Sequence, residues 1–170
     1  MIFETDRLNI RNLVDEDAAA FITLQTDHCV MRYVGGAQSA DQAKADLDKC
    51  IRAYAEVSDL WLIWAVVIRK TGQFIGTCAC IRGKEDDEIE IGFRLLPLAW
   101  NQGYASELVP HLIGHALKGL KANRVVASVD MQNIASMNVL DKCMIFQKTQ
   151  YNAEEQSLDR LYYTDVINIV

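Results

Sequence analysis

Hydrophobic and polar positions follow two periods along the chain, and each period predicts one kind of element. Apolar residues recur every three or four positions in four segments that we expect to be helices, at 15–26, 39–57, 103–118 and 133–143. They alternate with polar residues, or run continuously, in segments that we expect to be strands, at 3–12, 60–68, 74–82, 88–95, 123–129, 145–151 and 161–169. The stretches 28–38 and 152–159 are predicted to be connections.

The order of these segments predicts the fold class. Helices and strands are mixed along 170 residues without repeats or low-complexity linkers, which favours a single α/β (α+β) domain over 1–170, a mixed sheet with helices on both faces. The run 60–68 is apolar throughout, so its strand should be covered on both faces. Asp15 and Ser39 are expected to cap the first two helices.

The stretch EIEIGFRLLPLAWNQGYASE, residues 88–107, combines a predicted strand, a polar loop and the start of a helix. Strand alternation places Glu88 and Glu90 on one face and the intervening isoleucines on the other. A helix that begins at Gly103 leaves its first N–H groups unpaired and its positive dipole end exposed, which suits an anion. The pattern therefore suggests a catalytic base close to a phosphorylated cofactor. Pro110 should kink the helix or open it near Ser106.

The net charge of −6 argues against sequence-independent binding of nucleic acid, which needs clustered Lys and Arg. An acidic surface would weakly attract a cationic acceptor. The start MIFETDRLN lacks the pattern of a signal peptide, and no apolar run is long enough to span a bilayer. We expect a cytoplasmic protein with no membrane partner.

Five scattered cysteines, an odd number, are predicted to be small buried hydrophobes rather than disulfide partners or zinc ligands. His111 and His115 have the spacing of a zinc pair on a helix, but Leu112 stands where the catalytic glutamate of such a motif belongs, so we expect a surface pair and no metal. The three tryptophans are predicted to lie in the core and in pocket walls.

The loop W-N-Q-G-Y-A-S-E, following E-I-G-F, resembles the acyl-CoA-binding motif of the GNAT N-acetyltransferases, R/Q-x-x-G-x-G/A. Gly103 and Ala105 match two of its positions. Trp100 stands where Arg or Gln is usual, as in the branch that acetylates ribosomal-protein N-termini. The stretches ETDRLNIR at 4–11 and NIASMNVLDK at 133–142 resemble the same branch. Three ordered motifs thus extend the resemblance over nearly the whole chain.

The resemblance implies a GNAT-type, mostly antiparallel sheet and direct transfer of acetyl from acetyl-CoA to a primary amine, with a protein N-terminus as the first acceptor. As argued above from charge and from the Cys and His patterns, we expect no metal and no direct nucleic-acid partner. The resemblance also implies that the loop and its neighbours contact the cofactor. The implied cofactor-binding residues are Phe93, Arg94, Leu95, Asn101, Gln102, Gly103, Tyr104, Ala105, Ser106 and Asn133.

Glu90 is the candidate base and Ser136 the candidate proton donor to the departing sulfur, while an N–H within 92–95 supports the thioester oxygen. The alternative for Glu90 is a solvated residue paired with Arg94 or Lys84. For Ser136 and Asn133 the alternative is helix capping.

Other acceptors remain open, namely a polyamine, an amino acid or another small amine, as does a catalytically idle acyl-CoA-binding module. The acceptor pocket is expected to be lined by 27–38 and 152–159, and the protein to be a monomer or homodimer. Family members end the short helix with Leu-Gly-Phe. Because Met144 replaces that glycine here, the helix must end differently or strain Met144.

Overall fold

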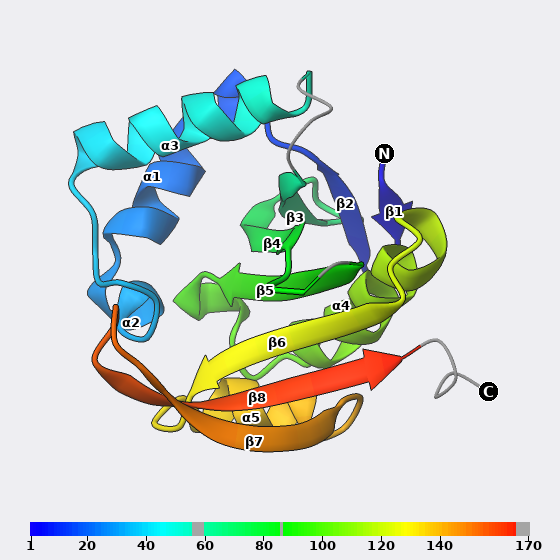
Figure 1. Ribbon diagram of the computed structural model, residues 1–170. Coiled ribbons are helices and arrows are strands. Elements are labelled where there is room, and N and C mark those ends of the chain that lie inside the picture. The colour runs from blue at the N-terminus through cyan, green and yellow to red at the C-terminus, as the bar shows by residue number, and fades with distance from the viewer. Residues whose placement is uncertain (56–59, 86, 166–170) are drawn as a thin grey trace.

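The computed structural model describes residues 1–55, 60–85 and 87–165 (Figure 1). Within them one sheet has eight strands in the order β1-β2-β3-β4-β5-β6-β8-β7. The strands are β1 (Phe3–Glu4), β2 (Leu8–Asn12), β3 (Trp61–Ile68), β4 (Phe74–Arg82), β5 (Glu88–Leu95), β6 (Arg124–Asp130), β7 (Ile145–Asn152) and β8 (Ser157–Asp165). All neighbouring pairs are antiparallel except β5 and β6, which are parallel. The predicted mixed, mostly antiparallel sheet is confirmed.

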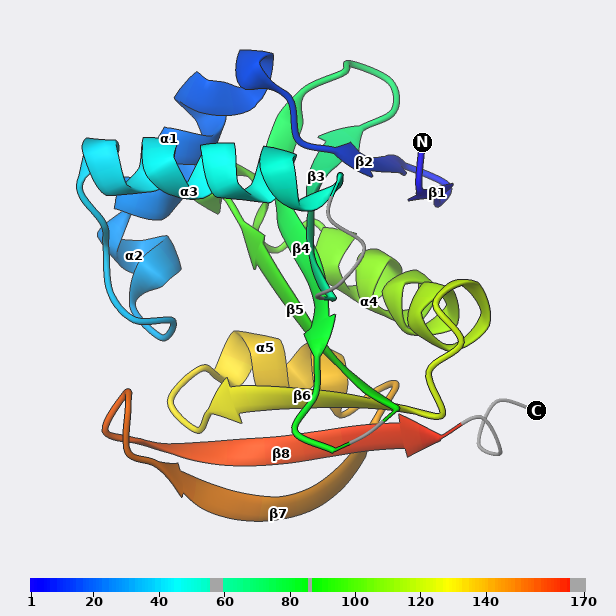
Figure 2. The ribbon, with the colours of Figure 1, turned by 45° about the horizontal axis from the view of Figure 1, so that its top comes forward.

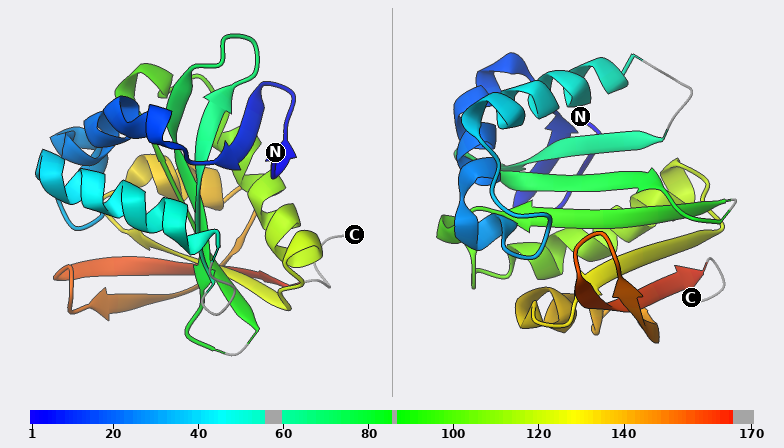
Figure 3. Two further views of the ribbon diagram at one scale, coloured as in Figure 1. Left: turned by 90° about the horizontal axis from the view of Figure 1, so that it is seen from above. Right: turned by 60° about the vertical axis from the view of Figure 1, so that its left-hand side comes forward.

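Helices cover both faces of this sheet, as predicted (Figure 3). The α-helices are α1 (Ala18–Thr26), α2 (His28–Met31), α3 (Ala40–Ala53), α4 (Tyr104–Gly114) and α5 (Ile134–Leu140). Short 3₁₀ turns occupy Asp15–Asp17 and Pro97–Ala99, and a π-helical turn, His115–Gly119, follows α4. Helices α1 and α3 pack together on one face, while α4 crosses behind the central strands on the other (Figures 1 and 2).

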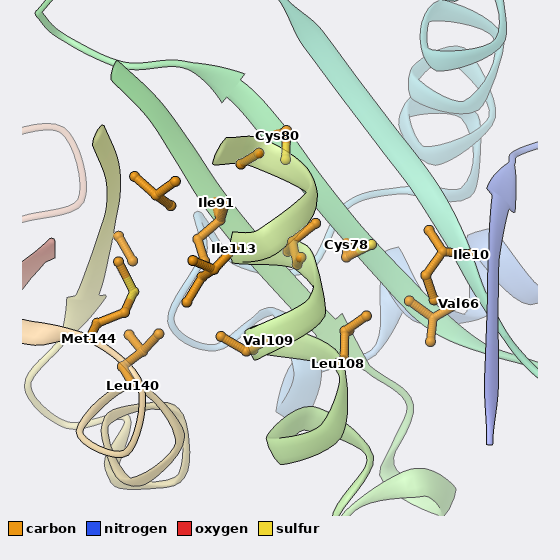
Figure 4. Close-up of a cluster of buried hydrophobic side chains, with 14 of the residues drawn as sticks. Ile10, Val66, Cys78, Cys80, Ile91, Leu108, Val109, Ile113, Leu140 and Met144 are labelled. Carbon is orange, nitrogen blue, oxygen red and sulfur yellow. The ribbon is translucent and has the colours of Figure 1, made fainter. Parts of the chain in front are cut away.

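Alternation along the strands divides the buried side chains between two hydrophobic clusters. Ile63, Ala65 and Val67 of β3 pack toward α1 and α3, whereas Trp64 and Val66 belong to the cluster that includes α4 and α5. Figure 4 shows the second cluster, with Leu108, Val109 and Ile113 of α4 set against the strands. Strand β3 is therefore covered on both faces, as its continuous apolar run predicted.

The N-terminal segment departs from the prediction in two places. The single strand expected over 3–12 is a hairpin, because the Thr5 N–H donates to the Leu8 carbonyl and the Leu8 N–H donates to Thr5 Oγ1. Asp15 does not cap the first helix. The carboxylate of Asp17 instead accepts the Val14 N–H at 3.0 Å and pairs with Arg11, and α1 begins after Asp17. The Ser39 cap is confirmed, with its side chain accepting the Gln42 N–H.

Two predicted connections contain regular structure. One helical turn, α2, lies within 28–38, because the Asp27 side chain accepts the N–H groups of Cys29 and Val30. Strand β8 begins at Ser157, well before the expected 161, because it pairs with β7 and β6 along its length. The expected end of this strand, 166–169, lies outside the described residues, as does the expected last turn of the second helix near Val57.

Helices α4 and α5 accommodate two unusual residues of the sequence, Pro110 and Met144. Pro110 lies inside α4, where it offers no N–H to the Ser106 carbonyl, and the helix still continues to Gly114. Helix α5 ends in a turn in which the Met144 N–H donates to the Leu140 carbonyl. Met144 is buried and has no positive φ, so the helix ends differently and Met144 is not strained.

The structure also shows the surroundings of the cysteines and of the histidine pair at the end of α4. All five cysteines are free thiols. Cys50, Cys78 and Cys80 are buried, as predicted, but Cys29 is exposed and Cys143 is only partly buried, so the prediction was wrong for these two. His111 is exposed, as expected, but His115 is only partly exposed, because its ring packs against Phe3 and Trp64. In the part of the chain described here, no helix has the length and apolar character to cross a membrane.

Candidate active site

The central feature of the site is the divergence of β5 and β6. The two strands pair in parallel only at Glu88 with Arg124, Ile89 with Val125 and Glu90 with Val126. Beyond these residues β5 runs on to Leu95 and β6 to Asp130, and the two strands no longer pair with each other (Figure 1). Helices α4 and α5 follow these strands, so both begin at the carboxyl ends of diverging strands. That position is where ligands bind in many α/β sheets.

The divergence leaves main-chain groups of β5 without a strand partner on one edge. The Leu96 N–H donates to Ile75 of β4, so alternate residues, Phe93 and Leu95 among them, direct their N–H and carbonyl groups toward β6. The Leu95 carbonyl accepts a 2.7 Å hydrogen bond from Trp100 Nε1. The side chains of Phe93 and Leu95 pack in the cluster under α4. What these two residues offer a ligand is therefore their N–H groups.

The loop between β5 and α4 has the conformation of an anion site. Asn101 and Gly103 have positive φ, 58° and 79°, and α4 begins without a side-chain cap. Across the described residues, no acceptor is hydrogen-bonded to the N–H groups of 102–106. Exposed N–H groups at the positive end of a helix dipole fit a diphosphate. The helix start that the sequence suggested for an anion therefore has open N–H groups at 102–106, and these groups are called the cradle below.

Other residues of the loop hold it in place. Trp100 ties it to the end of β5, and Gln102 Nε2 donates to the Leu98 carbonyl at 2.6 Å. Ala105 is partly buried against the core and Ser106 is exposed. Small residues on the first turn leave room for a ligand to approach the main chain.

Arg7 contacts this loop from the other end of the chain, a role that sequence reasoning did not assign. Its Nη1 donates to the Gln102 carbonyl at 2.9 Å, its guanidinium lies 4.5 Å from the Tyr104 ring centroid, and its Nε pairs with Glu107 at 2.5 Å. Burial alone would raise the pKa of Glu107, but hydrogen bonds from Thr5, the Arg7 N–H and the Arg7 guanidinium outweigh it and lower that pKa. The only signal was the position of Arg7 in the ETDRL motif.

Arg7→Met should raise the KM for acetyl-CoA by about tenfold, because it removes charge-assisted hydrogen bonds that hold the cradle. Arg69→Met is the matched control. Arg69 donates to the Thr5 carbonyl in the same β1–β2 turn, but it has no contact with α4 among the described residues. Steady-state kinetics with varied acetyl-CoA measures both variants. Equal changes in the two, or no change in Arg7→Met, would contradict the role.

Glu90 lies on the face of β5 that carries α1 and α3, together with Gly92 and Arg94, as the alternation predicted. Its carboxylate forms no salt bridge with any described residue, so the structure does not show the alternative, a pairing with Arg94 or Lys84. Burial, with smaller effects of Asp159 and Glu88 against the opposing effect of Lys84, raises the pKa of Glu90. A partly buried carboxylate with a raised pKa suits a general base.

Asn133 and Ser136 are placed at the start of α5. The Asn133 side chain accepts the Ser136 N–H at 3.1 Å, so the capping alternative holds for Asn133. The Ser136 hydroxyl forms no hydrogen bond with any described residue. Their contacts with the cofactor and with sulfur stay predictions.

Asp159 of β8 adds a buried carboxylate to the same sheet face, and sequence reasoning had assigned it to a connection. It is 5% exposed and accepts hydrogen bonds from Ser128, Asn152 and Ser157. No cation pairs with it among the described residues. It therefore adds negative potential near Glu90.

Arg94 is turned away from the cradle. Its Nη1 donates to Gln25 Oε1 at 2.7 Å and its side chain lies in a cavity beneath α1, α2 and α3. Contact of Arg94 with the cofactor stays a prediction, with its main chain as the available group. Within the described ranges, no cluster of three His, Cys, Asp or Glu is arranged to hold a metal ion.

Comparisons with known proteins agree with this geometry. The family described as acetyltransferase (GNAT) domain matches residues 7–144. The chain is 32% identical over 150 residues to the uncharacterized N-acetyltransferase YoaA of Bacillus subtilis, covering 86% of this chain and 83% of YoaA. Two solved structures share the fold. The ribosomal-protein-S5-alanine acetyltransferase of Vibrio fischeri has a TM-score of 0.79 at 16% identity, covering 98% of this chain and 97% of that one. The spermidine N-acetyltransferase of Vibrio cholerae, solved with CoA and spermine, has a TM-score of 0.77 at 16% identity, covering 94% and 95%.

Proposed function

Because the chain belongs to the acetyltransferase (GNAT) family, we propose that its site acetylates the α-amine at the N-terminus of a protein or peptide, with a ribosomal protein as the first candidate. Family membership makes the chain an N-acetyltransferase that uses acetyl-CoA. One observation supports the proposal most strongly. The N–H groups of 102–106 are open, and Glu90 lies on β5, the strand that leads to them and separates from β6.

The residues present fit the cofactor. The positive φ of Gly103 and the uncapped start of α4 suit a diphosphate held by the N–H groups of 102–106. Acetyl-CoA supplies an activated acetyl thioester. In the proposal, the N–H groups of Phe93 and Leu95 orient that end of the molecule and stabilise negative charge on the reacting carbonyl oxygen.

Proton transfer is assigned to side chains. Glu90, directly or through a water molecule, accepts the proton of the attacking amine, and the Ser136 hydroxyl donates a proton to the departing sulfur. An α-amine, with a pKa of about 8, needs less help from a base than a lysine side chain near 10.4. The raised pKa of Glu90 brings its proton affinity closer to that of such an amine.

The acceptor is the finer part of the proposal. The similarity to the Vibrio fischeri enzyme favours a protein N-terminus, and the similarity to the spermidine enzyme keeps a polyamine as the alternative. The negative potential of Glu90 and Asp159 attracts either kind of amine. Arg94, on the same strand face, disfavours a polycation.

A thiol-release assay with short peptides, spermidine and free amino acids tests the proposal. We expect release with at least one peptide, and Ser136→Ala should lower kcat by about a hundredfold, the lower end of the usual range for acid–base assistance, because proton donation to sulfur is lost. Thr23→Ala is the hydroxyl control, because the exposed Thr23 side chain donates to the Ala19 carbonyl within α1, on the opposite face of the sheet from α5. Tight CoA binding without release from any amine would favour the idle binding module instead.

A further inference from the structure

A cavity of about 130 Å³ lies on the α1–α3 face of the sheet, outside the cradle. Helices α1, α2 and α3 and strands β3 and β5 surround it. One part of its lining is apolar, including Phe21, Ile63 and Trp61. The other part is polar, and consists of Gln25, Gln38, Asp46, Lys49 and Arg94. Such a mixed lining is typical of a binding site for a small amphipathic group.

Arg94 brings to the cavity a positive charge that no salt bridge with a described residue neutralises. No carboxylate among the described residues lies within salt-bridge distance of its guanidinium, whose protein contacts are Gln25 Oε1 at 2.7 Å and Met31 sulfur at 3.3 Å. Burial lowers the pKa of Arg94 without neutralising it. A guanidinium that keeps free N–H groups beside a cavity is matched by a carboxylate, which it can bind through two parallel hydrogen bonds.

The other polar residues strengthen this match. Asp46 is engaged by Gln38 Nε2 at 2.7 Å, and Lys49 lies over the Trp61 ring at 4.4 Å. Two cations and one carboxylate therefore line the cavity.

The cavity and the proposed base lie along the same face of β5. Glu90, Gly92 and Arg94 share one face of β5, and a Cβ built at Gly92 would meet no atom within 4 Å, so the space between the two charged side chains is open. The acidic end of this face holds Glu90 near Asp159, and the basic end holds Arg94. This arrangement complements a molecule with an amine at one end and a carboxylate at the other.

We propose that the acceptor is zwitterionic and that Arg94 binds its carboxylate while its amine faces Glu90. The inference rests on the proposed acetyl transfer. Residues four apart in a strand have Cα atoms roughly 13 Å apart. If the two side chains extend from the strand in the same direction, their charged groups keep about this separation, and contacts of about 3 Å at each end leave roughly 7 Å between amine and carboxylate. A free α-amino acid is too short. The carboxylate belongs either to an acidic side chain next to a peptide N-terminus or to an ω-amino acid.

Two matched acceptor pairs test the proposal. The peptides Ser-Glu-Ala-amide and Ser-Gln-Ala-amide differ only in the carboxylate, and 6-aminohexanoate and hexylamine represent the second source. We expect kcat/KM to favour the carboxylate member of at least one pair by about tenfold or more, as for a charged hydrogen-bonded pair. Whichever pair shows the preference identifies the source. Arg94→Met should remove it, and Arg94→Lys should restore part of it.

The control is Arg52→Met, which removes a positive charge from an exposed position in the last turn of α3 and should keep the preference. Equal use of both members of both pairs, or a preference that persists in Arg94→Met, would overturn the proposal while leaving acetyl transfer intact.

If no acceptor is acetylated, the proposed function fails separately. Tryptophan fluorescence, to which Trp61 in the cavity wall contributes, then tests whether the acceptor binds. Ser-Glu-Ala-amide or 6-aminohexanoate should change it in the wild type but not in Arg94→Met, and an unchanged wild-type signal with both would refute binding.

Discussion

Glu90→Gln should lower kcat by about 10²-fold to 10⁴-fold, the usual contribution of general acid–base assistance. Glutamine keeps the size and polarity of the side chain but cannot accept the amine proton. Because burial raises the pKa of Glu90, the acidic limb of the wild-type pH profile should lie above the ordinary carboxyl range. Activity should rise with pH as Glu90 loses its proton, and this limb should be absent from the variant. Steady-state rates across pH measure both effects.

Two controls separate catalysis from folding in this experiment. Glu16→Gln changes an exposed carboxylate in the 3₁₀ turn before α1 and should leave the profile as in the wild type. The defect of Glu90→Gln should also shrink with acceptors of lower pKa, since they need less proton removal at a given pH. A variant that retains the wild-type rate and the same acidic limb would show that Glu90 is not the base.

Gly103→Val should raise the KM for acetyl-CoA by about a hundredfold. Gly103 has φ of 79°, a conformation that β-branched residues strongly avoid, and a Cβ there would lie 3.4 Å from Arg7 Nη2. The loop must therefore shift, and the N–H groups of 102–106 lose the arrangement that fits a diphosphate. Kinetics with varied acetyl-CoA, together with thermal unfolding, measures the change.

Gly72→Val is the matched control for this substitution. Gly72 has φ of 71°, lies in the turn between β3 and β4, and has open space around a built Cβ. Both variants should lose a comparable free energy of unfolding, about 1–2 kcal/mol from the left-handed conformation. Only Gly103→Val should raise the KM. A similar rise in both would mean that the loss is one of general stability.

The parts of the site predicted from the sequence are those fixed by neighbours in the chain. The alternation in 88–95 correctly separated Glu90 from the isoleucines, because strand geometry depends only on adjacent residues. The sequence likewise predicted correctly that α4 begins at Gly103. The Asp15 cap failed because Asp17 is held by Arg11 on the preceding strand, a contact made only after folding.

The parts that were missed depend on contacts between distant segments. Arg7 reaches Glu107 across 100 residues, and Asp159 is buried only because β8 lies between β6 and β7. The side chain of Arg94 follows the same strand alternation that placed Glu90. What it contacts was set by the packing of α1, α2 and α3, which no local pattern specifies.

The central claim is that the main-chain N–H groups at the start of α4 bind the diphosphate of acetyl-CoA. Amide NMR spectra of the labelled protein, titrated with CoA and separately with pantetheine, test it most directly, because pantetheine lacks the diphosphate. We predict that the N–H signals of 102–106 shift strongly with CoA and little with pantetheine, while those of Phe93 and Leu95 shift with both. Signals of 102–106 that stay unchanged in saturating CoA would contradict the claim.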